Sequence, residues 1–165
     1  MIEITSISEY IRENNVESGI IINILISFFL YISTWYIYAG FILYGDVQFL
    51  VGSIVGVYIT IKNKKPDQSF LKYGIITGIV GGVFSSILVA LFDWILYSLR
   101  VGFNIFSFFI LLLLMLLSGL AVGLLGGAGV SAYYMYKDVK GEKIIKRDNG
   151  LDEDFFKDLI EDKKS

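Results

Sequence analysis

Four long stretches of this chain contain no aspartate, glutamate, lysine or arginine, and they constrain the fold more than any other feature. In order along the chain, they are residues 18–45, 47–61, 73–92 and 101–136. A helix needs about 20 apolar residues to cross the hydrocarbon core of a bilayer. Three stretches reach that length. The second is shorter, at 15 residues, and qualifies only if its helix ends reach the interfaces at Asp46 and Lys62. A soluble domain of 165 residues cannot cover four such segments, so the sequence predicts an all-α, polytopic integral membrane protein.

The positions of the basic residues predict the topology. We expect a four-helix transmembrane bundle over residues 19–136, with crossings at about 19–42, 46–62, 72–97 and 105–136. Of the 14 lysines and arginines, this arrangement places all but Arg100 on one side of the membrane. Because basic residues concentrate on the cytoplasmic side, we expect both termini in the cytoplasm and the protein in the cell membrane.

The last uncharged stretch is long enough for two interpretations. It could form one tilted helix with an interfacial lead-in at 103–109, or it could form two short spans. A fifth crossing would place the basic segment 137–147 on the opposite side from 62–72, which the positive-inside tendency opposes. The distribution of charge therefore favours four crossings.

Polar segments flank the expected bundle. Residues 1–18 form an N-terminal amphipathic segment that we expect on the membrane surface, with docking on a partner as the alternative. Residues 137–165 form a charged cytoplasmic tail. Five apolar residues recur in the tail at helical spacing: Leu151, Phe155, Phe156, Leu159 and Ile160. This short amphipathic helix could lie on the membrane, on the cytoplasmic face of the protein itself or on a protein partner.

A glycine pattern occurs twice within the uncharged stretches. The run from Gly74 to Gly82 returns as the run from Gly119 to Gly127, and a serine follows each copy four residues later. Small residues at every fourth position form a stripe along a helix, where another backbone can approach closely. The expected helix-packing residues are Gly52, Gly56, Gly74, Gly78, Gly81, Gly82, Ser86, Gly119, Gly123, Gly126, Gly127 and Ser131.

The simplest arrangement packs the two glycine copies against each other within one chain. Gly82 follows Lys72 by ten residues, and Gly127 precedes Lys137 by ten. If both lysines lie at the cytoplasmic boundary, Gly82 and Gly127 lie at the same depth on antiparallel helices. The alternative is that one stripe faces a second protomer or a moving interface.

The residue types that most catalytic and metal sites need are missing from the sequence. The chain has no cysteine and no histidine, so it lacks a thiolate nucleophile and the commonest metal ligand and general base. We therefore expect no enzyme activity, no cofactor and no metal. The crossings carry hydroxyl and amide side chains that can hydrogen-bond between helices: Asn23, Ser27, Thr34, Ser53, Thr77, Ser85, Ser107 and Ser118.

Asp93 and Arg100 are the charged residues nearest to a candidate site. Asp93 lies 21 residues beyond Lys72, about 30 Å along a helix, which places it at the outer interface. Arg100 follows seven residues later, so the two side chains could share a helix face and form an interfacial ion pair. A substrate or ion site is the alternative, and Asp46 in the outer turn could join Asp93 in a weak cation site.

Seven residues within 52–90 carry a resemblance to a known family: Gly52, Gly56, Tyr58, Gly74, Gly78, Gly81 and Gly82. This segment resembles a family of small, glycine-rich, four-helix archaeal membrane proteins of unknown function. Those proteins also have a glycine-bearing helix, a short polar loop and a GxxxGxxGG-type helix. The resemblance covers about a quarter of the chain and implies a fold class and a prokaryotic membrane setting.

Two classes of function fit these features. The first is a non-enzymatic structural, accessory or interaction protein of the membrane, whose tail contacts a cytoplasmic protein. The alternative is a small oligomeric channel or transporter component that could respond to tension. The lack of a polar or charged pore-lining stripe in the sequence favours the first class. The net charge of −2 predicts no nucleic-acid partner. The expected partner is the lipid bilayer, and the further candidates are a protein bound through the cytoplasmic tail and a second copy of this chain.

Overall fold

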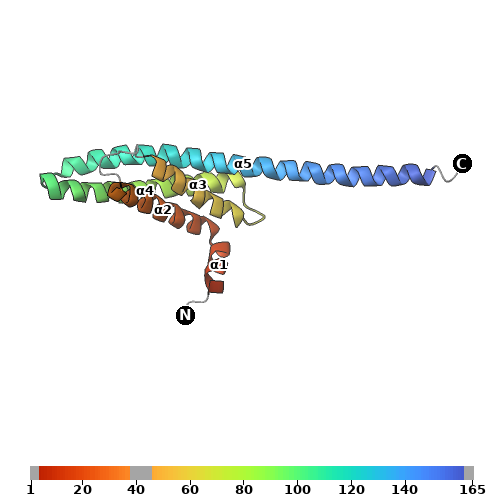
Figure 1. Ribbon diagram of the computed structural model, residues 1–165, viewed down its shortest axis with the longest axis horizontal. Coiled ribbons are helices and arrows are strands. Elements are labelled where there is room, and N and C mark those ends of the chain that lie inside the picture. Colours follow the sequence, from red (N-terminus) through yellow and green to blue (C-terminus); the bar gives the residue numbers. More distant parts are fainter. Residues whose placement is uncertain (1–3, 38–45, 162–165) are drawn as a thin grey trace. The chain divides into compact units, whose positions relative to one another are not determined.

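The chain forms five α-helices within the residues that its computed structural model describes (Figure 1). The structure describes the backbone of residues 4–37 and 46–161, and the side chains of residues 8–34 and 46–140. The helices are α1 (Ile4–Glu13), α2 (Asn15–Ile37), α3 (Val47–Lys62), α4 (Phe70–Val101) and α5 (Ile105–Glu161). The predicted all-α fold is confirmed for this part of the chain.

A bend at Asn14 separates α1 from α2, and Figure 1 shows α1 turned away from the axis of α2. α2 begins at Asn15, before the expected start of the first crossing at residue 19. Asn15 is only 2% exposed, and its side chain hydrogen-bonds to residues outside α2. The bounds of the polar N-terminal segment, 1–18, stay a prediction.

A break between α4 and α5 shows how the last uncharged stretch folds. Gly102 has a φ of 106°, a left-handed conformation that favours glycine, and its N–H donates to the carbonyl oxygen of Ser98 at 3.0 Å. The side-chain oxygen of Asn104 then accepts a hydrogen bond from the N–H of Phe106 at 3.0 Å, which satisfies a free donor in the first turn of α5. The stretch is therefore one helix that begins at Ile105, without a second short span.

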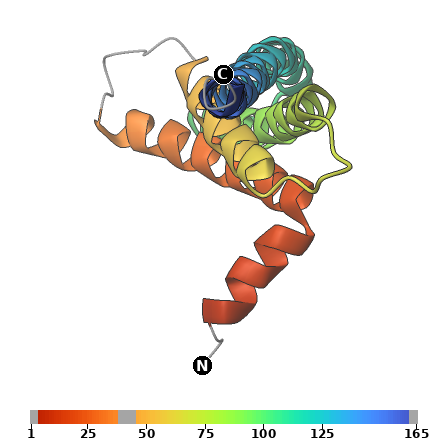
Figure 2. The ribbon, with the colours of Figure 1, turned by 90° about the vertical axis from the view of Figure 1, so that its right-hand side faces the viewer.

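The chain divides into two compact units, Met1–Ala132 and Tyr133–Ser165. In the first unit α2, α3 and α4 pack against one another, and α5 contacts α3 and α4 (Figure 2). In the second unit α5 continues to Glu161, so the backbone at 151–160 is helical. The apolar side chains that the sequence places on one face of this segment lie outside the described residues.

The interior of the first unit is small and polar, whereas its surface is apolar. The buried polar side chains are Asn15, Ser18, Asn23, Ser27, Gln48, Ser53, Thr60, Thr77, Ser85, Ser86 and Ser131. Large apolar side chains point outward: Phe29 is 70% exposed, Phe106 75% and Leu125 67%. Soluble proteins show the opposite distribution, because burial of apolar surface drives their folding. A surrounding lipid phase removes that requirement, since lipid tails are as apolar as these side chains.

Three helical segments are long and apolar enough to cross a membrane: Asn15–Thr34, Phe70–Val101 and Ile105–Lys140. α3 is apolar but shorter, because its 16 residues extend about 24 Å. By length and composition, these three helices are consistent with a membrane protein.

Candidate functional site

The predicted glycine stripes of α4 and α5 lie directly against each other. The facing pairs are Gly74–Gly127, Gly78–Gly123 and Gly82–Gly119. A methyl group added at Gly78 would overlap the carbonyl oxygen of Gly123, and one added at Gly127 would lie 2.7 Å from the carbonyl oxygen of Gly74. The obstructing atoms belong to the backbone, so they cannot rotate aside as a side chain could. Glycine at these positions is what allows the two helices to approach so closely.

The predicted alignment of the two stripes is wrong. The sequence places Gly82 at the level of Gly127, whereas in the structure Gly82 faces Gly119. In an antiparallel pair, all three glycines of one stripe face glycines of the other only if the first glycine of the α4 stripe, Gly74, lies opposite the last glycine of the α5 stripe, Gly127. The predicted alignment would instead bring Gly74 opposite Met135, whose side chain would hold the helices apart.

Ser86 and Ser131 occupy the ends of this contact. Both are fully buried, and each hydroxyl donates to the carbonyl oxygen four residues earlier in its own helix, at 2.7 Å and 2.6 Å. The hydroxyl oxygen of Ser86 fills the space that a side chain would need at Gly119, and that of Ser131 fills the space at Gly74. The serines therefore satisfy their own hydrogen bonds while they extend the close packing.

Three other predicted glycines lie against polar side chains of neighbouring helices. A methyl group at Gly52 would meet the hydroxyl of Ser27 first and then Asn23, one at Gly81 would meet the side chain of Asn23, and one at Gly126 would meet Ser53. Asn23 is fully buried: its Oδ1 accepts a hydrogen bond from Ser27 at 3.2 Å, and its Nδ2 has no hydrogen-bond partner among the described residues. Asn23 thus occupies the space that glycines leave on both α3 and α4.

Sequence reasoning missed the buried face of α2. A methyl group at Gly19 would lie 2.6 Å from the carbonyl oxygen of Gly56, so these residues form another backbone contact, between α2 and α3. The signal was available, because α2 carries a residue of this face at every fourth position: Asn15, Gly19, Asn23, Ser27 and Tyr31. The spacing that marks the stripes of α4 and α5 therefore marks α2 as well.

A pair of side-chain amides joins the start of α2 to the turn between α3 and α4. The Nδ2 of Asn15 donates to the Oε1 of Gln68 at 2.7 Å, and the Nε2 of Gln68 donates back to the Oδ1 of Asn15 at 3.3 Å. Asn15 also donates to the carbonyl oxygen of Thr60 at 3.0 Å, and the hydroxyl of Thr60 lies 3.0 Å from that of Thr77. We call Asn15 and Gln68 the amide clamp, since they connect α2 to the turn that follows α3.

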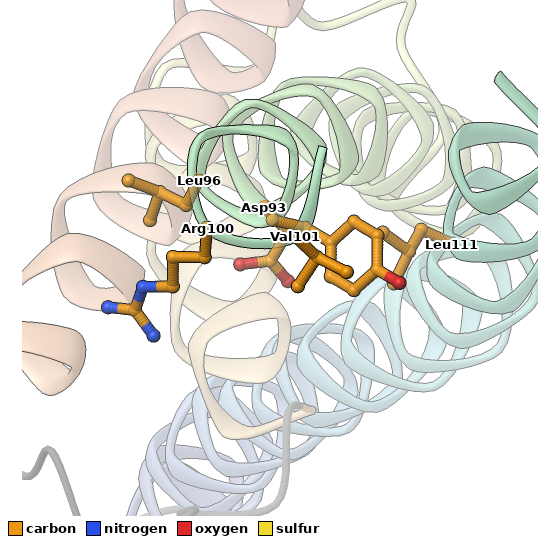
Figure 3. Close-up of a pocket in the computed structure, with 6 residues that line it drawn as sticks. Asp93, Leu96, Arg100, Val101 and Leu111 are labelled. Atoms are coloured by element: carbon orange, nitrogen blue, oxygen red, sulfur yellow. The ribbon is translucent and has the colours of Figure 1, made fainter. Parts of the chain in front are cut away.

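A pocket of about 380 Å³ lies beside the last turns of α4 (Figure 3). Its lining residues are Asp93, Leu96, Tyr97, Arg100, Val101 and Leu111. The volume lies within the range of small-molecule sites in proteins. The pocket combines a carboxylate, a guanidinium and a phenol with three aliphatic side chains, a set that can recognise charge and apolar surface together.

Asp93 is held in this pocket from α2, because the hydroxyl of Tyr31 donates a hydrogen bond to its Oδ1. Figure 3 shows the guanidinium of Arg100 directed away from the Asp93 carboxylate, and the ion pair between them stays a prediction. Asp46 accepts a hydrogen bond from Ser118 of α5, and its cation site with Asp93 also stays a prediction. Among the described residues, no three acidic, histidine or cysteine side chains approach closely enough to hold a metal ion.

The chemistry available in the pocket is recognition of charge. One carboxylate oxygen of Asp93 is engaged by Tyr31, and the described residues place no nucleophile and base together beside it. Comparison with known proteins finds no matching family model, no matching curated protein and no matching solved structure, so the functional argument rests on the geometry alone.

Proposed function

We propose that this protein is an integral membrane protein of the structural, accessory or interaction type, with four crossings and both termini in the cytoplasm. The observation that carries the proposal is the reversed polarity of the first unit. Its interior contains Asn23, Ser27 and Thr77 at 0% exposure, while Phe29 and Leu125 face outward. Such a surface is stable when lipid covers it.

In this proposal α3 also crosses the membrane, as the second of the four crossings in chain order, although it is short. Its basic end can reach the interface, because the ammonium of Lys62 lies 5.8 Å from the centre of the Tyr58 ring. Lys64, just beyond α3, lies 4.5 Å from the ring centre of Phe70. Long basic side chains over aromatic rings are common at membrane boundaries, where the ammonium remains solvated and the stem lies against apolar groups.

The packing of the bundle supports an accessory role over a channel. The glycine stripes that a ring of protomers would need are occupied by contacts within the chain, such as Gly78 with Gly123. Several interior hydroxyls donate to the backbone of their own helix, as Ser85 does to Gly81 at 2.7 Å. A pore needs polar groups that face a continuous water-filled path. Helices that touch through their backbones leave no such path along the contact.

The topology can be tested by cysteine labelling, because the natural chain contains no cysteine. Single substitutions Asp67→Cys, Phe103→Cys and Lys140→Cys lie at exposed positions outside the proposed crossings at 46–62, 72–97 and 105–136. A membrane-impermeant maleimide should label Asp67→Cys and Lys140→Cys in inside-out vesicles, and Phe103→Cys in right-side-out vesicles. The unsubstituted chain is the blank. Labelling of positions 67 and 140 from opposite sides would disprove the four-crossing arrangement.

The accessory role can be tested by reconstitution. Liposomes that contain the purified full-length chain should show the same ion and solute leakage as empty liposomes, both at rest and under osmotic tension. A conductance that appears with the protein and disappears in a Gly78→Leu variant that remains membrane-inserted would favour the channel instead.

A further inference from the structure

The turn between α3 and α4, with the helix ends on either side of it, carries a concentrated positive charge. Residues 62–72 contain four lysines and one aspartate, which gives this segment a net charge of +3. The lysines are Lys62, Lys64, Lys65 and Lys72, and we call them the basic surface. Figure 1 shows this turn at the opposite end of α4 from the break before α5.

The ammonium groups of the basic surface are not neutralised by carboxylates of the described part of the chain. Lys62, Lys64 and Lys72 lie over aromatic rings, with distances from ammonium to ring centre of 5.8, 4.5 and 5.8 Å. Among the residues whose side chains the structure describes, no aspartate or glutamate forms an ion pair with any of the four lysines. An ammonium has three N–H donors, and a ring face does not use all of them. The basic surface can therefore still bind an anion.

Two of these lysines continue the apolar faces that α3 and α4 turn outward. On α3, the exposed Ile54 and Tyr58 precede Lys62 at four-residue spacing. On α4, Lys72 precedes the exposed Ile76 by four residues. Each of these two faces thus ends in a positive charge on the side of the turn.

We propose that the basic surface binds anionic phospholipids such as phosphatidylglycerol. The ammonium groups of Lys62 and Lys72 bind the phosphate, and the acyl chains lie along the outward faces that these lysines continue. Lys64 and Lys65 add to the electrostatic attraction from the turn. The proposal rests on the membrane insertion proposed above, because lipid reaches these faces only if the helices cross the bilayer.

The apolar faces favour a lipid over a soluble polyanion. A nucleic acid or an acidic peptide would bind the charges but would leave Ile54, Tyr58 and Ile76 without a partner. An anionic phospholipid has a negative charge at one end and hydrocarbon at the other, so it matches lysine and apolar face together. Phosphatidylcholine also carries a phosphate, but its own ammonium cancels the net charge that attracts the lysines.

Native mass spectrometry of the full-length protein, with lipids added at equal concentration, tests the proposal. Phosphatidylglycerol should be retained about fivefold more than phosphatidylcholine, the ratio expected from a single lysine beside an anionic headgroup. Lys62→Gln/Lys72→Gln should remove most of this preference. Lys62→Arg/Lys72→Arg should keep it, because arginine retains the charge and binds phosphate. Equal retention of both lipids by the natural chain, or the same ratio in the glutamine variant, would overturn the proposal.

A second pair of variants tests whether the position of the charge matters. Lys72→Gln and Arg100→Gln each remove one positive charge from α4, at opposite ends of the helix. Lys72→Gln should lower the ratio of phosphatidylglycerol to phosphatidylcholine, whereas Arg100→Gln should leave it unchanged. Equal losses would show that any cation on the protein serves, and the assignment to the basic surface would fail.

Soluble anions distinguish a lipid from other negatively charged ligands. Glycerophosphoglycerol, which lacks acyl chains, should not displace bound phosphatidylglycerol at equal concentration, and neither should a polyglutamate peptide. Displacement by either would show that the apolar faces contribute nothing and would overturn the lipid assignment. Cysteine labelling of the topology leaves these lysines unchanged, so it can succeed where lipid selection fails.

Discussion

At Gly78 the obstacle to any side chain is the backbone of Gly123, and the contact is reciprocal, because a methyl group at Gly123 would overlap the carbonyl oxygen of Gly78. Neither atom can move without shifting a whole helix. We therefore expect Gly78→Ala to lower the free energy of unfolding by about 1–3 kcal/mol, the usual cost of overpacking a core. Thermal or SDS unfolding in detergent micelles measures the change.

Gly129 supplies the control, on α5, the helix that carries the facing Gly123. It is exposed, its backbone is helical, and no atom lies within 4 Å of an added methyl group. Gly129→Ala should be neutral or should stabilise by at most about 1 kcal/mol, because alanine is the better helix former. Equal destabilisation by Gly78→Ala and Gly129→Ala would show that close backbone packing is not the reason for these glycines.

Gly81 tests a different kind of neighbour. An added methyl group there would meet the side-chain amide of Asn23, which can turn about its χ angles, whereas the neighbour at Gly78 is backbone. Gly81→Ala should therefore cost less than Gly78→Ala. The double variant Gly81→Ala/Asn23→Ala removes the two nearest obstructing atoms, Nδ2 and Cγ of Asn23, and leaves only the Cβ at 2.9 Å, so the loss should be smaller than the sum of the two single losses. Strict additivity in unfolding measurements would contradict the contact.

At the level of elements, the amide clamp holds the start of α2 against the turn that follows α3. Asn15 and Gln68 exchange two hydrogen bonds at 2.7 Å and 3.3 Å, and both side chains lie largely out of solvent. A double-mutant cycle with Asn15→Ala and Gln68→Ala should give a coupling energy of about 1 kcal/mol. A coupling near zero, with both single variants destabilised, would mean that the two amides act separately.

The sequence was sufficient to identify helices and glycine faces, but it could not align them. The stripe through Gly78 and the stripe through Gly123 are visible because spacing within one helix is a local property. Their alignment depends on how two helices slide past each other, and the basic residues locate the membrane boundary too coarsely to fix it. The alignment follows instead from mutual fit, which brings Gly82 to Gly119.

The second face of α4 was missed for a related reason. Thr77, Gly81 and Ser85 are buried and recur at four-residue spacing. Gly81 was predicted as a packing residue and Thr77 and Ser85 as hydrogen-bonding side chains, but the three were not recognised as one face. A helix inside a bundle needs a small face for each neighbour, so one stripe gives an incomplete account of a buried helix. The pocket around Asp93 could not be predicted from the sequence. Its lining combines residues of α4 with Leu111 of α5, and the turn at Gly102 is what brings these two helices side by side.

For the molecule as a whole, the distribution of small residues determines which surfaces remain for lipid and for partners. The close contacts that glycine permits are used inside the first unit, between α2 and α3 and between α4 and α5. The outward side chains are large, and Phe29 at 70% exposure and Leu114 at 58% are examples. Membrane helices associate mainly through small residues that let backbones approach, so a surface of large side chains favours lipid over a second copy.

We therefore expect the protein to be a monomer in lipid nanodiscs. Subunit counting by single-molecule photobleaching, with one fluorophore on Lys140→Cys, should give a single bleaching step per particle at all protein-to-lipid ratios that leave most discs empty. The labelled position lies beyond the contacts of the glycine stripes, so the fluorophore does not disturb them. A fixed number of steps above one, independent of dilution, would show that large side chains of the outer surface form a specific interface. The interior glycines would then no longer account for all of the assembly, and the oligomeric channel would again be the stronger hypothesis.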